Sequence, residues 1–168
     1  MSFITASIPV DAPGPAVWHT FADFGGVSDW HPYFESAHLD DPRQPTGVGA
    51  SRTCVFGPRM AIRETVTGWT ENERMTIGIE FLSGPPMPIT DIEAAVIVSE
   101  QAEGGPTDLT LTMAYEPRWG PIGRILDALM VRRMYEDVFA EMLPAAKAYT
   151  ESGTRPEPVA MLGSGRRL

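Results

Sequence analysis

Glu64 has the clearest potential for chemistry in this sequence, because it is a carboxylate on the apolar side of a predicted strand. Between Met60 and Phe81 two stretches alternate apolar with polar residues. This pattern is typical of half-buried strands, in which side chains alternate with period two. It places Glu64 on the same face as Ile62 and Val66. A buried carboxylate is costly without a partner, so the pattern predicts either an internal ion pair or the polar anchor of a cavity.

The lengths of the connections predict the partner of this carboxylate. If residues 57–59 form a three-residue loop, Arg52 lies opposite Glu64 on the neighbouring strand. A four-residue loop further on places Trp69 opposite Arg74. As candidate catalytic residues, Glu64 would move a proton and Arg52 would hold an enolate or carbonyl oxygen. A purely structural ion pair is the alternative.

Other residues that could do chemistry are sparse. Cys54 is the only cysteine, and no strand–turn–helix nucleophile elbow surrounds it. The three histidines lie far apart and lack metal-ligand spacing, and His31 is expected to be an exposed loop residue. Lys147, the only lysine, is expected in a solvated position near the end of a helix. We therefore expect no metal and no cofactor.

Length and charge limit the classes of protein to which the chain can belong. Its 168 residues suffice for one domain with a sizeable core, which we place at residues 1–152, followed by a disordered tail at 153–168. The net charge of −9 disfavours nucleic acid and anionic membrane surfaces as partners. The sequence shows neither a signal peptide nor a run of ~20 apolar residues. We expect a cytoplasmic protein without membrane insertion.

The apolar periodicity predicts an α+β protein with a strand, two short helices, six further strands and a long last helix. Six of these seven strands have strand-like ranges, namely 3–10, 50–56, 60–69, 74–81, 92–98 and 109–115; helical ranges are 16–22, 27–34 (a short helix or a turn) and 120–151. Hairpin-length connections make the sheet antiparallel. A single helix about 10 Å wide cannot fill a strongly curved sheet, so we expect a cavity between sheet and helix.

The residues expected to line this cavity lie on inward faces of the strands and the last helix, or in neighbouring loops. They are Trp30, Ile62, Glu64, Ile77, Ile79, Phe81, Met87, Leu111, Met113, Tyr115, Met130 and Met134. The methionines among them would form a soft wall that adapts to different apolar ligands. The apolar stripe of the last helix is wider than packing on the sheet requires, which also suits a homodimer contact.

Several short motifs, taken in order, point to a fold family. They are Ile8-Pro9-Val10-Asp11-Ala12-Pro13 with Val17-Trp18, Asp23-Phe24 through Asp29-Trp30-His31-Pro32, Ile62-Arg63-Glu64-Thr65-Val66, Gly84-Pro85-Pro86-Met87-Pro88, and residues 115–124 before the last helix. Over roughly residues 3–150 the chain resembles the START/Bet v 1-like (SRPBCC, helix-grip) superfamily, and within it the polyketide cyclase/dehydrase-like branch. This resemblance implies a seven-stranded curved antiparallel sheet wrapped on a long C-terminal helix. It also implies a hydrophobic cavity gated by the proline-rich loop, with Glu64 at a position that often lines it.

The same resemblance implies a hydrophobic small-molecule partner, aromatic polyketide-like or lipid-like, and possible cyclisation or dehydration of it. A non-catalytic carrier or sensor and a protein-interaction module without an open cavity are the alternatives, since this superfamily serves many functions. The chain has no counterpart of the catalytic lysine of plant alkaloid-forming members. It also lacks the iron and iron–sulfur ligands of the ring-hydroxylating oxygenases. Trp30-His31-Pro32 replaces the tryptophan-rich signature of Hsp90-activator-like members.

Overall fold

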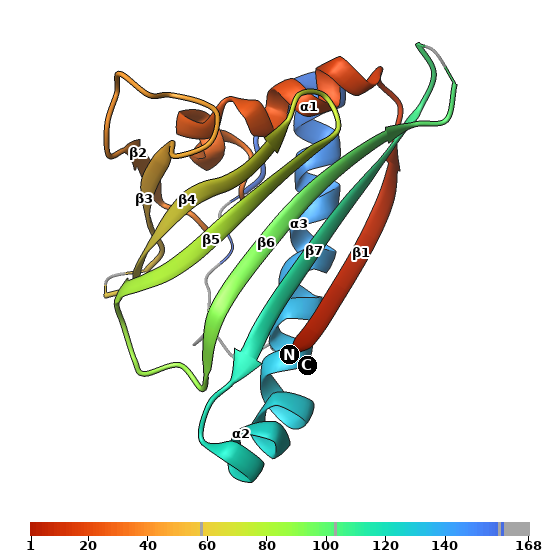
Figure 1. The fold of residues 1–168 in the computed structure, drawn as a ribbon. Coiled ribbons are helices and arrows are strands. Elements are labelled where there is room, and N and C mark those ends of the chain that lie inside the picture. Colours follow the sequence, from red (N-terminus) through yellow and green to blue (C-terminus); the bar gives the residue numbers. More distant parts are fainter. Residues whose placement is uncertain (58, 103, 158, 160–168) are drawn as a thin grey trace.

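A curved antiparallel sheet and a long C-terminal helix make up most of the molecule (Figure 1). The computed structural model describes residues 1–57, 59–102, 104–157 and 159. The strands are β1 (Ser2–Val10), β2 (Ser36–Leu39), β3 (Ser51–Val55), β4 (Ala61–Thr70), β5 (Arg74–Ser83), β6 (Ile89–Glu100) and β7 (Thr107–Pro117). The helices are α1 (Gly14–Ala22), the 3-10 helix η1 (Phe24–Asp29), α2 (Gly120–Leu126), the π-helical η2 (Asp127–Val131) and α3 (Arg132–Ser152).

The strand order is β1-β7-β6-β5-β4-β3-β2. Every neighbouring pair is antiparallel, and only the β1–β7 pair joins strands that are distant in the sequence. The helix α3 crosses behind the sheet, while α1 lies at one end of α3 (Figure 1). The predicted α+β helix-grip fold is confirmed.

The register of the central strands follows the predicted connections with one exception. Arg52 on β3 pairs with Glu64 on β4, as expected. Along β4 and β5 a bulge next to Val66 shifts the pairing by one residue, so that Trp69 pairs with Met75 rather than with the residue before it. A β-bulge places an extra residue on one strand, which loop lengths alone do not reveal.

Three other features differ from the prediction. The short strand β2 lies in a stretch for which no strand range was predicted. The second short helix is η1, which ends before Trp30 instead of spanning 27–34. The long helix predicted at 120–151 is divided, because the π-helical turn η2 separates α2 from α3.

The π-helical turn changes which side chains of the last helix face the sheet. A π-turn adds a residue to the turn, so the apolar stripe before it is out of phase with the stripe after it. Met130 in η2 is 57% exposed, and the prediction that it faces inward is wrong. Past the turn, α3 buries Val138, Phe139, Leu143 and Ala146 against the rest of the core.

The helix α3 ends at Gly153, whose φ of 69° is a left-handed conformation that favours glycine. Just after it, Arg155 pairs with Asp29 of η1 at 3.0 Å. Residues 158 and 160–168 of the tail predicted to be disordered lie outside the described part of the chain. No helix among the described residues combines the length and apolarity needed to span a membrane.

Candidate functional site

A buried ion pair between Arg52 and Glu64 lies at the centre of the candidate site. Nε of Arg52 donates to Oε2 of Glu64 at 2.6 Å, and the two residues are only 5% and 7% exposed. Arg52 Nη1 also donates to the carbonyl oxygen of Phe24 at 2.7 Å, and its guanidinium lies 3.9 Å from the centre of the Phe24 ring. The predicted pairing is confirmed, and three contacts hold Arg52 in one position.

The thiol of Cys54 lies beside this pair. Its Sγ is 3.6 Å from Oε2 of Glu64. Burial and the neighbouring carboxylate of Glu64 raise the pKa of Cys54 well above its ordinary value. The group therefore stays a thiol at neutral pH and is not a nucleophile.

Trp30 and His31, which directly follow η1, lie near the Arg52–Glu64 pair. The Trp30 side chain is 4% exposed, and its indole N–H has no hydrogen-bond partner among the described residues. His31 is also buried and stacks on Phe34, with ring centres 3.7 Å apart. Nδ1 of His31 accepts a 3.3 Å hydrogen bond from the backbone N–H of Tyr33.

Burial, and next the charge of Arg52, lower the pKa of His31 to about 3. The ring is therefore neutral at physiological pH. The prediction that His31 is an exposed loop residue is wrong. Neighbouring aromatic residues 30, 33 and 34 were the sequence signal that this segment packs inward.

These polar side chains border a cavity between the sheet and α3. It is lined by Phe21, Trp30, His31, Arg52, Glu64, Met75, Ile77, Ala94, Ala95, Val96, Leu111, Thr112, Phe139 and Met142. Its volume of about 60 Å³ holds a few water molecules, whereas pockets for drug-sized ligands measure roughly 300–1,000 Å³. The expected hollow is present but nearly filled by side chains.

The residues predicted to line the cavity divide into five groups. Trp30, Glu64, Ile77 and Leu111 border it, as does Arg52. Ile62, Met113 and Tyr115 are buried in the core without bordering it, whereas Met87 and Met134 are half-buried. Ile79 and Phe81 border a different, open pocket, and Met130 is exposed. Lining residues that were not predicted include Phe21, Phe139 and Met142, which come from both helices that cover the sheet.

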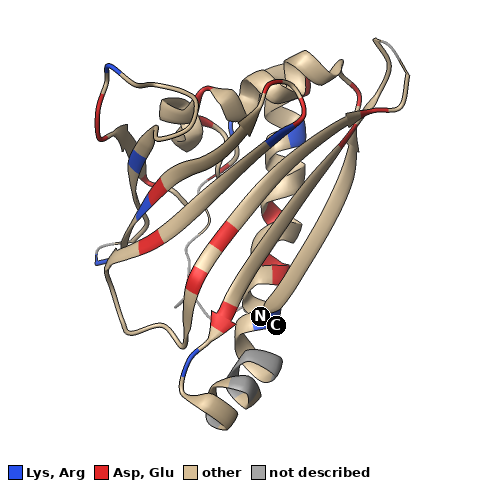
Figure 2. Cartoon of the chain, viewed as in Figure 1, with Lys and Arg blue, Asp and Glu red and all other residues tan. Residues whose placement is uncertain are grey.

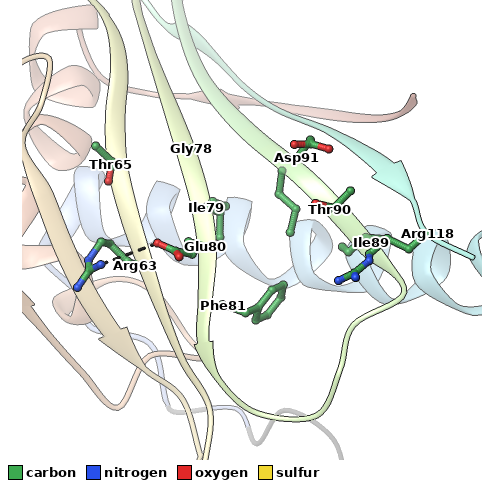
Figure 3. Close-up of a pocket in the computed structure, with 11 residues that line it drawn as sticks. Arg63, Thr65, Gly78, Ile79, Glu80, Phe81, Ile89, Thr90, Asp91 and Arg118 are labelled. Atoms are coloured by element: carbon green, nitrogen blue, oxygen red, sulfur yellow. Dashed lines mark ion pairs between the residues drawn. The ribbon is translucent and has the colours of Figure 1, made fainter.

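The open pocket lies where β5 and β6 separate (Figure 3). The ladder between these strands ends at the pair Ile79–Ile92, and beyond it a space of about 470 Å³ opens. Apolar side chains such as Phe81 lie within the gap, while Arg63 and Glu80, 3.8 Å apart, lie at its rim (Figure 3). Ile79 also pairs with Glu64, so this pocket and the interior cavity are adjacent in the sheet.

Among the residues that the structure describes, no group of three or more His, Cys, Asp and Glu side chains could hold a metal ion. The polar residues of the interior instead offer hydrogen-bond donors, a carboxylate and a guanidinium at one end of an apolar space. Such an arrangement can orient the polar end of an apolar molecule.

Comparisons with known proteins agree on the fold. The sequence profile described as "Polyketide cyclase / dehydrase and lipid transport" matches residues 1–151. No curated protein sequence matches the chain significantly. A protein from Thermobifida fusca solved by NMR is 23% identical with a TM-score of 0.70, covering 94% of this chain and 98% of its own.

Two further solved structures are similar at lower identity. The protein XoxI from Bacillus cereus is 17% identical with a TM-score of 0.69, over 90% of this chain and 97% of its own. Truncated norcoclaurine synthase from Thalictrum flavum is 14% identical with a TM-score of 0.68, over 90% of this chain and 94% of its own. At these identities the similarity establishes the shared architecture alone.

Proposed function

The chain belongs to the polyketide cyclase / dehydrase and lipid transport family, and we propose that it binds a hydrophobic small molecule between its sheet and α3. The molecule is aromatic and polyketide-like, or lipid-like. Its apolar body contacts the side chains on the inner faces of β5, β6 and β7, and its polar end reaches Trp30 and Arg52. This division into an apolar body and a few fixed polar contacts is the general plan of ligand pockets.

The unpartnered indole N–H of Trp30 is the observation that carries this proposal. A buried donor without an acceptor costs about 1–3 kcal/mol, so such groups are rare in folded proteins. The N–H belongs to a residue that borders the interior cavity. A carbonyl, hydroxyl or phenolate oxygen of a bound molecule would accept this hydrogen bond and remove the cost.

The small volume of the cavity requires side chains to move when the molecule binds. Met75 and Met142 border the cavity, and methionine side chains adapt to different shapes because they are unbranched and flexible. The separated ends of β5 and β6 lie next to the cavity and provide additional room. We propose that the interior opens on the side of these strands.

Replacing Trp30 by phenylalanine tests the polar contact. Trp30→Phe removes the unpartnered N–H and keeps most of the ring, so its free energy of unfolding should equal or exceed that of the wild type by up to about 1 kcal/mol. Affinity should fall by about fivefold, the equivalent of one hydrogen bond of about 1 kcal/mol. The measurement is a titration with the molecule that native mass spectrometry identifies in the freshly purified protein, or with 1-anilinonaphthalene-8-sulfonate if none is found.

Trp69→Phe is the matched control, because the Trp69 indole N–H already donates to Glu71 at 2.7 Å and does not border the cavity. Its affinity should equal that of the wild type. Equal affinities for the wild type and Trp30→Phe would contradict the role of the indole. A protein-interaction module with a filled interior would bind neither the co-purified molecule nor the probe.

Catalysis is the second candidate function, favoured by the presence of a buried carboxylate on the cavity wall. Glu64 would transfer the proton in a cyclisation or dehydration, while Arg52 would hold the oxygen that becomes negative. Glu64 must first leave Arg52, to which it is bound at 2.6 Å, and this favours a carrier over an enzyme. We expect Glu64→Gln to change affinity only; loss of turnover with unchanged binding would instead identify an enzyme.

A further inference from the structure

The region around α2 and η2 projects beyond the end of the sheet (Figure 1). We define the α2 tip as the exposed side chains of Trp119, Ile125, Leu129 and Met130 together with three exposed arginines that flank them, Arg118, Arg132 and Arg133. Trp119 and Gly120 both have left-handed backbones, with φ of 65° and 57°, and they turn the chain out of β7 into α2. Exposed large apolar side chains that gather at one place mark an interaction surface.

The charge of the α2 tip is opposite to that of the whole chain. Residues 118–133 contain four arginines and one aspartate, although the chain has a net charge of −9. Arg118 lies in the connection between β7 and α2, whereas acidic side chains are spread along the strands and α3 (Figure 2). Two carboxylates that flank this stretch are already paired: Glu116 with the N-terminal ammonium at 2.9 Å, and Glu136 with Arg132 at 3.6 Å.

We propose that the α2 tip docks on a lipid surface that carries anionic headgroups. Tryptophan and aliphatic side chains enter the boundary between headgroups and acyl chains, and flanking arginines bind the phosphate groups. Charges further than about 8 Å from the surface are screened at physiological ionic strength, so the acidic residues along the sheet do not oppose this contact. The net charge of the chain disfavours anionic membrane surfaces as partners, but this expectation does not hold at the α2 tip.

A second copy of the chain fits the α2 tip less well. A twofold symmetric dimer would bring the arginines of two tips together, which costs energy. If the basic tip docked instead on an acidic face of another copy, the contact would be head-to-tail. Such a contact does not form a closed dimer. An anionic lipid surface satisfies both the apolar and the basic residues in one contact.

Vesicle sedimentation with the full chain tests this proposal. We expect the wild type to bind vesicles of 70% phosphatidylcholine and 30% phosphatidylglycerol at 0.1 M NaCl. Binding should be at least about fivefold weaker to pure phosphatidylcholine, and weaker again at 0.5 M NaCl. Leu129→Asp and Arg133→Glu should each reduce partitioning into the anionic vesicles by about tenfold.

Matched controls lie in the loop between β2 and β3, away from the α2 tip (Figure 1). Val48→Asp replaces an apolar side chain that is 58% exposed, close to the 67% of Leu129, and Arg43→Glu reverses an exposed arginine. Neither should change partitioning.

The proposal is overturned if the wild type does not bind anionic vesicles, or if the tip and control variants bind equally. It is also overturned if Leu129→Asp converts a dimer into a monomer in light scattering while vesicles bind neither form. Vesicle binding does not require a ligand in the interior, so this result and the ligand titrations can fail separately.

Discussion

Arg52→Met is expected to lower the free energy of unfolding by about 3–5 kcal/mol, because it leaves the carboxylate of Glu64 buried without its cation. The two side chains are 6% and 9% exposed, so water does not replace the lost contact. The carbonyl oxygen of Phe24 loses its donor as well. Equilibrium unfolding in urea at pH 7 measures the change, provided that the slope of the transition stays constant.

The double variant Arg52→Met with Glu64→Leu should recover most of this loss, because a buried ion pair can be replaced by apolar side chains of similar size at little cost. A deficit of about 1–2 kcal/mol should remain from the unpaired Phe24 carbonyl. Arg63→Met is the control on the opposite face of β4, where Arg63 is half-exposed, and it should cost at most about 1 kcal/mol. If the losses at Arg52 and Glu64 simply added in the double variant, the two residues would not act as a buried pair.

The Arg52–Glu64 pair was predictable from sequence because it depends on short-range rules. Strand alternation places Glu64 on the apolar face, and the three-residue connection fixes the position of β3 against β4. The predicted pairing of Trp69 with Arg74 was wrong, because the bulge beside Val66 adds a residue on one strand only. A bulge depends on packing and hydrogen bonding across the sheet, and Gly68, an isolated glycine within the strand pattern, was the sequence signal for it that went unused.

Burial that arises from contacts between distant segments was not predictable in the same way. His31 was expected in an exposed loop, yet it is covered: its ring packs against Trp30 and Phe34, and the preceding helix η1 contacts β2 and α1. The inward position of Met130 was predicted from a continuous helical period, which the π-turn of η2 interrupts. The cavity was expected from the width of one helix, but Phe21 and Phe139 fill much of that space. Side-chain volume, rather than element order, sets the size of the interior.

Arg52 and His31 together determine how the polar end of the interior responds to acid. Protonation of His31 would place a second cation near Arg52 in a region without solvent. It would also convert the acceptor Nδ1 into a donor that faces the N–H of Tyr33. Both effects oppose the charged form of the ring, so the folded protein keeps His31 neutral down to about pH 3.

Acid should therefore destabilise the protein through His31. In the unfolded chain the imidazole takes up a proton below its ordinary pKa of 6.5, whereas in the folded protein its pKa is about 3. Between these values the unfolded state binds more protons, so the stability that is complete above pH 6.5 is lost as the pH falls towards 3. The total loss from this residue is about 4–5 kcal/mol, of which about 2–3 kcal/mol occurs between pH 7 and pH 4.5. Urea unfolding at these two pH values measures it.

His31→Asn removes the titration and retains an oxygen in reach of the Tyr33 N–H. The variant should start from a lower stability at pH 7, because its stacking on Phe34 is lost. Its further loss at pH 4.5 should be about 2–3 kcal/mol smaller than that of the wild type. His38→Asn, at an exposed position on β2, should keep the pH dependence of the wild type. The free energy of unfolding of the wild type and of His31→Asn could instead fall in parallel as the pH is lowered. His31 would then titrate equally in the folded and unfolded states, and the end of the interior next to Arg52 would admit water.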